Sequence, residues 1–329
     1  MTLSIKPRLG ALLALSLAAA TAAAKPVPAE FLHDQVWLVP RVEGREVRLF
    51  TDTGGGFNAL SATVAAQLGL ATETVEADGQ PMQLAPFPRF DEGFALPAPP
   101  PYFMDGRMAV VPPAAFHVAA DGFLGGRWFA DGIWDFDYPA GTLHHLEAFE
   151  PTPGMHGVDL GFQVRDDGQR TMHFPSMAMT VAGEELHVLL DTGATATLGE
   201  DAAAAFGLQA GTPVGTSFIE REVFERWAAA NPGWRVLERG DALRGQSFRM
   251  IEVPEISIGG LAIGPVWFTE RPPGAFQKYM ASMMDRPTWG ALGGSAFRHV
   301  RMVVDYPAAK AWFAVNPGTA PAPSGHPSR

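Results

Sequence analysis

The 329-residue sequence contains no cysteine, which excludes several kinds of chemistry. Without a thiol the chain has no disulfide, no cysteine nucleophile, no thiolate metal ligand and no Cys-linked lipid anchor. It also lacks a Gly-x-Ser-x-Gly nucleophile turn and a His-Glu-x-x-His metal helix, and its Gly-rich stretches lack the Lys of a phosphate-binding loop. We therefore expect no cofactor and no metal.

Positive charge is also scarce. The 24 Lys and Arg residues stand against 35 Asp and Glu, for a net charge of −11, so electrostatics favour neither nucleic acid nor an anionic membrane as a partner. The composition, 47% hydrophobic and 18% charged, is globular, and 36 Gly with 29 Pro favour a turn-rich β architecture. The length suggests two domains.

The N-terminal segment has the features of a signal peptide. Lys6 and Arg8 precede an uncharged run over residues 9–24, which is rich in Ala and Leu and ends in three alanines. A membrane anchor is the alternative, but this run is short and alanine-rich for a spanning helix of ~20 apolar residues. We expect residues 1–24 to be removed after Ala24. The mature protein would then be periplasmic or secreted, with no membrane span and a net charge near −13.

One long internal repeat dominates the rest of the sequence. The triplet Asp-Thr-Gly stands at 52–54 and again at 191–193, each time after a β-rich segment with a Gly turn and before a short helix. A Gly-x-Leu-Gly-Gly element follows at 122–126 and at 290–294. In both copies Asp-Tyr-Pro begins twelve residues after the first glycine of the Gly-Gly pair. Equal spacing at both ends of a long unit indicates a duplicated half.

The repeat divides the chain into two lobes at a Pro/Gly-rich turn near residues 150–154. We assign 25–150 to the N-terminal lobe, 151–316 to a C-terminal lobe with insertions, and 317–329 to a disordered tail. Capping and stop residues predict short helices that begin near Ser61 and near Glu200, and two helical runs within the insertion, 219–230 and 274–285. Residues 253–268 are typical of a further hairpin.

Two carboxylates, one from each half of a duplicated chain, suggest an acid–base site on a pseudo-twofold axis. If Asp52 and Asp191 lie in contact, both cannot ionise, and they share one proton. The ionised member can then remove a proton from water while the protonated member hydrogen-bonds to the carbonyl that the water attacks. Such a pair titrates as a unit. An isolated Asp of this kind is equally typical of a turn or helix cap, and the matched pair is what favours chemistry.

The residues next to each Asp suit a rigid turn. Gly54 and Gly193 allow the backbone to approach the carboxylates closely. Thr53 and Thr192 can hydrogen-bond to backbone groups and so hold the turns in place.

With both triplets and the hydrophobic-hydrophobic-Gly elements 123–125 and 291–293, the chain resembles aspartic proteases of the pepsin and retropepsin-like group over residues 30 to 315. The resemblance implies an all-β fold with short helices, made of two pseudo-twofold related β-barrel lobes. An extended peptide or protein substrate would lie in the cleft between them. It also implies that Asp52 and Asp191 form the catalytic dyad, and that Thr53 and Thr192 brace the lobes beneath it.

The sequence departs from the family pattern after the first triplet. The family commonly has Ser, Thr or Ala there, followed by Ser, Thr or Asp, and the second lobe complies with Ala194 and Thr195. We therefore expect Thr195 to support the dyad. The first lobe instead has Gly55-Gly56 and lacks a hydroxyl that could orient Asp52. Tyr102 is the candidate flap aromatic, with a loop or surface tyrosine as the alternative.

The sequence thus predicts an exported aspartic-type endopeptidase, a hydrolase that cleaves peptide bonds with dyad-activated water. Because both half-sites lie in one chain, we expect a monomer. The alternative is a protease-fold module with weak or no catalysis that binds extended peptides or cell-wall fragments, which Gly55-Gly56 would favour.

Overall fold

The structure is a computed structural model, and it describes residues 24–77, 79–102 and 104–315. Residues 1–23 of the expected signal peptide and the expected tail 317–329 lie outside the described residues. Among the helices of the described ranges, none is long and apolar enough to cross a membrane.

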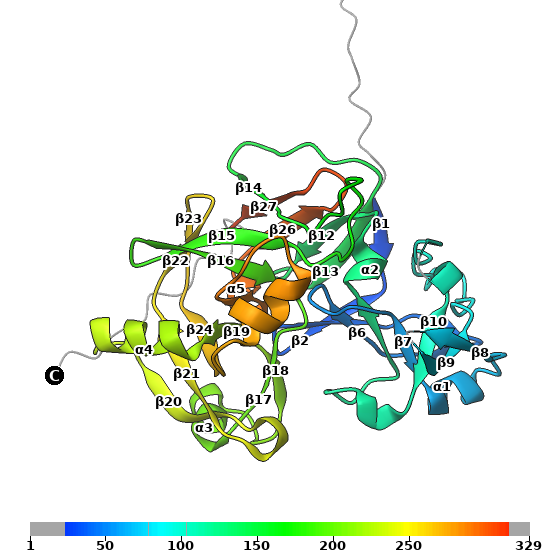
Figure 1. Cartoon of the computed structure of the whole chain (residues 1–329), viewed down its shortest axis with the longest axis horizontal. Helices are drawn as coiled ribbons and strands as arrows, with labels where there is room; N and C mark the ends of the chain where they lie inside the picture. The colour runs from blue at the N-terminus through cyan, green and yellow to red at the C-terminus, as the bar shows by residue number, and fades with distance from the viewer. Residues whose placement is uncertain (1–23, 78, 103, 316–329) are drawn as a thin grey trace, which may run out of the picture.

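Each half of the chain builds one large sheet (Figure 1). The sheet of the first half has eight strands in the order β2-β3-β6-β11-β7-β10-β9-β8. Their bounds are β2 (Ala29–Leu32), β3 (Gln35–Leu38), β6 (Leu49–Asp52), β7 (Ala59–Ser61), β8 (Glu73–Ala77), β9 (Gln80–Ala85), β10 (Met108–Val111) and β11 (Gly122–Gly125). A separate two-stranded ribbon, β4 (Arg41–Val42) with β5 (Arg45–Glu46), falls between β3 and β6 in the sequence.

The sheet of the second half has nine strands in the order β20-β21-β24-β19-β25-β16-β15-β22-β23. Their bounds are β15 (Ser176–Val181), β16 (Glu184–Leu190), β19 (Ser217–Glu220), β20 (Val236–Asp241), β21 (Phe248–Val253), β22 (Ile256–Ile258), β23 (Leu261–Ile263), β24 (Val266–Arg271) and β25 (Gly290–Leu292). A separate ribbon pairs β17 (Thr195–Thr197) with β18 (Pro213–Gly215).

The helices are short. They are α1 (Ala62–Gln67), α2 (Gly126–Phe129), α3 (Glu200–Phe206), α4 (Arg221–Ala230) and α5 (Gly294–Phe297), with single turns η1 (Met104–Gly106), η2 (Pro113–Ala115), η3 (Leu243–Gly245), η4 (Ala275–Tyr279) and η5 (Met280–Met283). The expected mostly β fold with short helices is confirmed.

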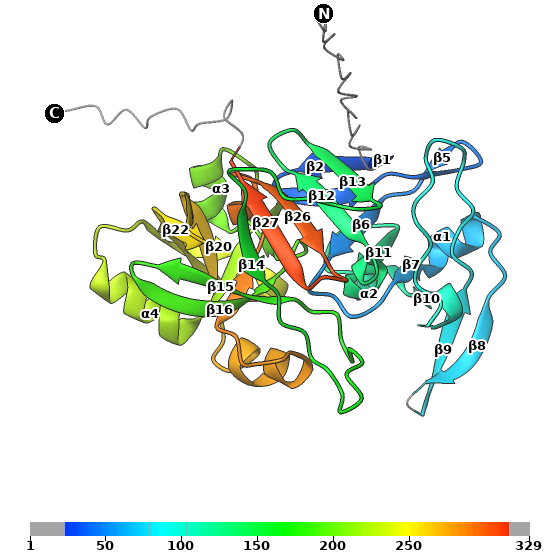
Figure 2. The same cartoon turned by 90° about the horizontal axis from the view of Figure 1, so that it is seen from above.

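A third sheet joins the halves, and its strands run between the two lobes in Figure 2. Its order is β1-β13-β12-β26-β27-β14. The strands are β1 (Ala24–Val27), β12 (Ile133–Asp137), β13 (Thr142–Leu146), β14 (His156–Asp159), β26 (Arg301–Asp305) and β27 (Lys310–Ala314). Three strands come from each half, and the order is symmetric about the central antiparallel pair β12–β26, as a duplicated chain requires.

An ion pair with one buried partner crosses this central seam. The Arg301 guanidinium donates two hydrogen bonds, of 2.9 and 2.8 Å, to the Asp135 carboxylate, which is 6% exposed. Bidentate pairing of this kind satisfies a buried charge and sets the register of the two strands. Asp135 is therefore occupied in joining the halves.

The local signals of the repeat match the observed turns and caps. The β4–β5 and β15–β16 connections place Glu43-Gly44 and Ala182-Gly183 at positive φ, the geometry of tight hairpin turns. The Ser61 hydroxyl accepts a hydrogen bond from Val64 N and begins α1, and Gly207 in the left-handed region ends α3. The hairpin expected within 253–268 is formed by β22 and β23.

The two helices expected in the insertion are only partly correct. The first begins at Arg221 rather than at residue 219, because Ile219 pairs with Gly290 and Glu270 in the sheet as part of β19. Residues 274–285 form the π-helical and 3-10 turns η4 and η5 instead of one regular helix.

The sheets hold the two Asp-Thr-Gly triplets at strand ends. In the first lobe β11 runs parallel to β6 and places Gly125 opposite Asp52. In the second lobe β25 runs parallel to β16, and Asp191 N donates to Leu292 O at 2.9 Å. The three residues directly before each triplet, 49–51 and 188–190, are buried. Each Asp is thus presented from a rigid support.

Candidate active site

The structure brings the two Asp-Thr-Gly turns face to face. The carboxyl groups of Asp52 and Asp191 are hydrogen-bonded to each other. Each also packs over the glycine of the opposite turn. A Cβ added at Gly193 would lie 2.2 Å from Asp52 Cγ, and one at Gly54 would lie 2.7 Å from Asp191 Cγ. Only glycine leaves room for the facing carboxyl group at either position.

Backbone amides hold each carboxylate in place. Gly54 N donates to Asp52 Oδ1 and Gly193 N to Asp191 Oδ1, both at 2.9 Å. These bonds fix the inner oxygens through the turn itself. The carboxyl groups therefore have little freedom to rotate away from each other.

Burial dominates the electrostatics of the pair. It raises the pKa of the Asp52 carboxyl well above its usual value, and the charge of Asp191 and the hydrogen bond between the two raise it further. Burial also raises the pKa of Asp191, against the lowering effect of hydrogen bonds from Asp52 and from backbone amides. The pair as a unit holds a proton at pH values where a free Asp is ionised.

Thr53 and Thr192 link the two halves beneath the carboxyl groups. Thr53 N donates to Thr192 Oγ1 at 3.2 Å, and Thr192 N donates to Thr53 Oγ1 at 2.9 Å. The Thr53 hydroxyl donates in turn to Leu190 O at 2.8 Å. Both threonines are completely buried. The reciprocal bonds fix the separation of the two turns.

Thr195 supports the second turn with a hydrogen bond from its side chain to the backbone of that turn. Its hydroxyl donates to Gly193 O at 2.9 Å and accepts a bond of 2.9 Å from Gln35 Nε2 of the other half. No motif in the sequence points to Gln35, because the bond joins residues 160 positions apart. Thr195 thus stabilises the loop that carries Asp191 and ties it to the first lobe.

Phe123 accounts for the glycine after the first triplet. A Cβ at Gly55 would lie 2.5 Å from Phe123 Cζ and 3.0 Å from Asp52 Cγ. The aromatic ring occupies the space into which a side chain at position 55 would extend. The ring beside Asp52 therefore accounts for the absence of a side chain at position 55.

A cavity of about 190 Å³ opens beside Asp52, and its walls are largely apolar. It is lined by Asp52, Gly55, Gly56, Phe57, Val111, Ala115, Phe116, His117 and Phe123. Phe116 and His117 had no distinguishing sequence pattern. The His117 ring packs edge-on against Phe50, with ring centroids 5.4 Å apart. The cavity is suited to one apolar side chain next to the carboxyl pair.

The structure places Tyr102 outside this cavity. It lies between β9 and β10, its ring is 6.0 Å from that of His173, and its hydroxyl donates to Asp131 at 3.1 Å. The side chain is 57% exposed. These surroundings fit a loop or surface tyrosine better than a flap residue over the carboxyl pair.

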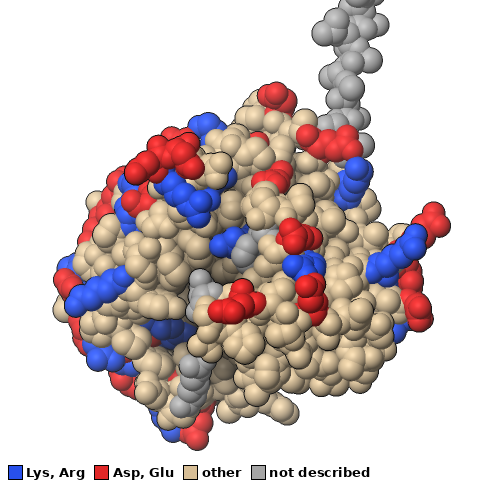
Figure 3. All heavy atoms as spheres, turned by 45° about the vertical axis from the view of Figure 1, so that its right-hand side comes forward, with Lys and Arg blue, Asp and Glu red and all other residues tan. Residues whose placement is uncertain are grey.

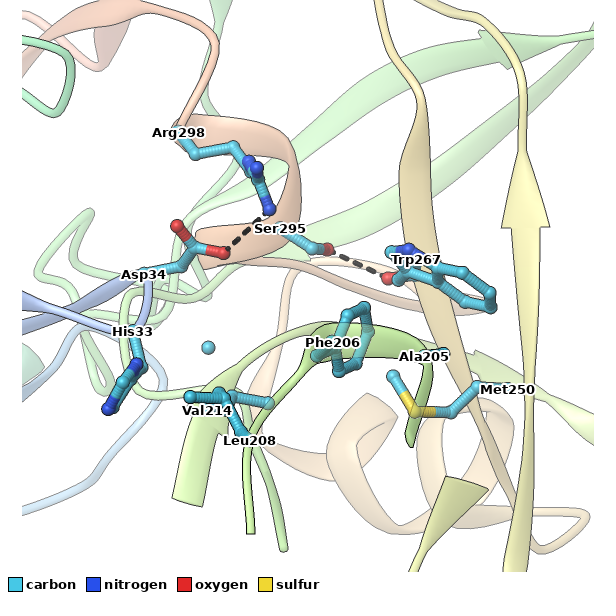
Figure 4. Close-up of a pocket in the computed structure, with 11 residues that line it drawn as sticks. His33, Asp34, Ala205, Phe206, Leu208, Val214, Met250, Trp267, Ser295 and Arg298 are labelled. Atoms are coloured by element: carbon cyan, nitrogen blue, oxygen red, sulfur yellow. Dashed lines mark hydrogen bonds and ion pairs between the residues drawn. The ribbon is translucent and has the colours of Figure 1, made fainter. Parts of the chain in front are cut away.

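A second cavity, of about 400 Å³, lies where the β2–β3 turn of the first lobe docks on the second lobe (Figure 4). Gly215 N donates to His33 O at 2.7 Å, and Arg298 pairs with Asp34 at 3.2 Å. Apolar side chains including Phe206 and Trp267 form the rest of its wall. The predicted site residues do not line it, so we regard it as part of the contact between the lobes.

Potential metal ligands are dispersed. Within residues 24–315, leaving out 78 and 103, no three or more His, Asp or Glu side chains are grouped so that they could hold a metal ion.

The arrangement of two lobes has a counterpart among solved structures. The aspartic proteinase from Irpex lacteus superposes with a TM-score of 0.55 over 91% of this chain and 99% of that chain. The fold is that of a pepsin-like aspartic proteinase. The sequences are only 10% identical, so the likeness concerns the fold alone. No family model matches the chain, and no curated protein does. The two-lobed, pepsin-like architecture that the resemblance implied is confirmed.

Proposed function

We propose that the chain is an exported aspartic-type endopeptidase that hydrolyses peptide bonds with water activated by Asp52 and Asp191. The observation that carries this proposal is the direct contact of two carboxyl groups, buried Asp191 and partly buried Asp52, one from each half of a pepsin-like fold. A structural role as turn caps would not require the two to meet, because each already receives its own backbone amide.

In the proposed reaction the pair begins with one shared proton. The ionised carboxylate takes a proton from a bound water, whose oxygen attacks the peptide carbonyl carbon. The protonated carboxyl donates a hydrogen bond to the carbonyl oxygen and stabilises the charge that develops there. The tetrahedral intermediate then collapses, the C–N bond breaks, and a carboxyl proton passes to the leaving nitrogen.

The surroundings of the pair suit this chemistry. The raised pKa of Asp52 keeps one carboxyl protonated while its neighbour is ionised, so an acid and a base are present together. The bonds between Thr53 and Thr192 hold both groups in position, which lowers the cost of orienting them in the transition state. The apolar cavity beside Asp52 would receive a substrate side chain next to the bond to be cut.

The export part of the proposal rests on residues 1–24. Expression of the full sequence in a bacterial host, followed by fractionation and N-terminal sequencing, tests it. We expect a periplasmic or secreted product that begins at Lys25. A product found only in the cytoplasm with its first 24 residues intact would contradict export. We also propose a monomer, which light scattering of the mature protein can check.

A peptide-binding module without turnover is the second candidate, favoured by the absence of a hydroxyl at Gly55 next to Asp52. A fluorogenic peptide library, assayed between pH 3 and 8 with the mature protein, separates the two candidates. We expect cleavage by the wild type and a loss of at least about 1,000-fold in kcat for Asp52→Asn and for Asp191→Asn, because either change removes the shared-proton pair. Circular dichroism must show that both variants are folded.

Full activity in either variant would refute the assignment of the dyad. Saturable peptide binding by the wild type with no turnover at any pH would instead support the binding module.

A further inference from the structure

One arginine, Arg127, lies next to the cavity beside Asp52, although the chain as a whole is acidic. Arg127, in α2, donates from Nε to Gly56 O at 3.1 Å. Gly56 itself lines the cavity beside Asp52. The Arg127 guanidinium is thereby placed at the edge of the proposed substrate cleft. It also contacts Met172 Sδ at 3.8 Å and remains half-exposed.

Two more arginines, Arg165 and Arg170, influence the pKa values of Arg127 and of a neighbouring group through their positive charge. The charge of Arg165 adds to partial burial in lowering the pKa of Arg127. Arg170 lies 3.9 Å from the centroid of the Phe162 ring and donates to Tyr306 O at 2.6 Å. These contacts hold Arg170 in place against the lobe.

A buried histidine lies within reach of the same charges. Burial and the charges of Arg127 and Arg170 lower the pKa of His173 to about 4, so the imidazole is neutral at pH 7. Two carboxylates oppose these positive charges. Asp131, which accepts a hydrogen bond from Tyr102, acts on the pKa of Arg170 and His173, and Asp305 acts on the pKa of Arg170.

The face shown in Figure 3 has a hollow near the centre of the view, with both basic and acidic groups around it. On an acidic protein, acidic peptides are repelled at long range, so a local arginine is what would make the binding of a carboxylate favourable. A half-buried guanidinium binds a carboxylate through two parallel hydrogen bonds and more strongly than an exposed one.

We propose that Arg127 binds a carboxylate of the peptide substrate on the Gly56 side of the cleft. This inference rests on the proposed endopeptidase function. The preferred substrate then has an apolar residue in the cavity beside Asp52 and an acidic group farther along the chain. The carboxylate can come from an Asp or Glu side chain or from the C-terminus of the peptide.

The test uses the mature protein and peptides that differ only in charge. Each carries an apolar residue at the cut and either Glu or Gln at one position, which is varied along both sides, and each is made with a free or an amidated C-terminus. We expect kcat/KM to be about tenfold higher for Glu than for Gln at one position, or for the free C-terminus. The side-chain and C-terminal arms identify which carboxylate is bound. The preference should weaken at 0.5 M NaCl for this half-exposed site.

The variant Arg127→Gln keeps a donor for Gly56 O and removes the charge. We expect it to lose the preference for Glu, measured as the ratio of kcat/KM for the paired Glu and Gln peptides, while Arg127→Lys keeps part of it. Arg239→Gln is the matched control, because Arg239 pairs with Glu200 and Asp201 on the surface of the second lobe. It should leave the preference unchanged.

Equal rates for all charge-matched peptides, or an unchanged preference in Arg127→Gln, would overturn the inference. If no peptide is cleaved, the proposed catalysis fails, and fluorescence anisotropy with the same labelled peptides decides the subsite separately. Tighter binding of the acidic peptides that is lost in Arg127→Gln supports it. Equal binding of all peptides, or no binding, refutes it.

Discussion

The threonine bonds between the lobes allow a quantitative prediction. In Thr53→Val the side chain keeps its shape but loses the hydroxyl. Thr192 N then has no acceptor, and Leu190 O loses its bond from the hydroxyl. All of this occurs at a position with no solvent exposure, so water cannot replace the lost partners.

The expected cost follows from these two groups. A buried N–H without a partner costs about 1–3 kcal/mol, and the loss of the second hydrogen bond adds about 1 kcal/mol. The free energy of unfolding should therefore fall by about 2–4 kcal/mol. Thr53→Ser keeps the hydroxyl and removes one buried methyl group, at a cost of about 1 kcal/mol. Thr192→Val removes only the acceptor of the longer, 3.2 Å bond and should cost less than Thr53→Val.

Urea unfolding of the mature protein, followed by tryptophan fluorescence and by far-UV circular dichroism, measures these differences if the two probes give one transition. Peptidase assays on the same samples should show kcat reduced at least about tenfold in Thr53→Val, because the two carboxyl groups lose their fixed separation. Thr53→Val as stable as Thr53→Ser would show that the bonds between the turns do not stabilise the fold, and the reasoning would fail.

Two further predictions concern the carboxyl pair. Gly193→Ala should abolish peptide cleavage, because the added Cβ would lie 2.2 Å from Asp52 Cγ. The control Gly56→Ala should stay active, because the nearest atoms to its Cβ would be 3.7 Å away. A near-wild-type kcat in Gly193→Ala would contradict the contact. The pKa of Asp52 is raised in the folded protein, so its proton stabilises the fold at low pH, and this contribution is lost as the pH rises from about 4 through the folded-state pKa. The side chain introduced by Asp52→Asn does not titrate, so this variant should gain stability relative to the wild type as the pH rises through that range. If the difference in unfolding free energy between the two proteins does not change with pH, the pKa of Asp52 is not raised by burial as described.

The duplicated pattern made the fold and the main residues of the site predictable. Asp52 and Asp191 stood out because each carries the same neighbours and the same downstream element, and a repeat of that length implies symmetric halves. The caps at Ser61 and Gly207 were predictable because they depend on local backbone geometry.

Other features depend on contacts that no local pattern contains. The bond from Gln35 to Thr195 joins positions 160 apart, and the contact of Arg127 with Gly56 joins positions 71 apart. The ring of Phe123 explains Gly55 only once the two strands are side by side. Sheet pairing also overrode the helical pattern at Ile219, because its neighbours in the sheet could not be identified from the sequence.

The central sheet has a consequence for any attempt to divide the chain. If the backbone were cut in the loop between β13 and β14, the first fragment would carry β12 and the second β26, each with a row of unsatisfied backbone donors and acceptors at its edge. Neither fragment would be a self-sufficient unit, and each would tend to pair through that edge with the other fragment or with another copy of itself. The single chain therefore keeps permanently together two parts that would otherwise have to find each other in solution.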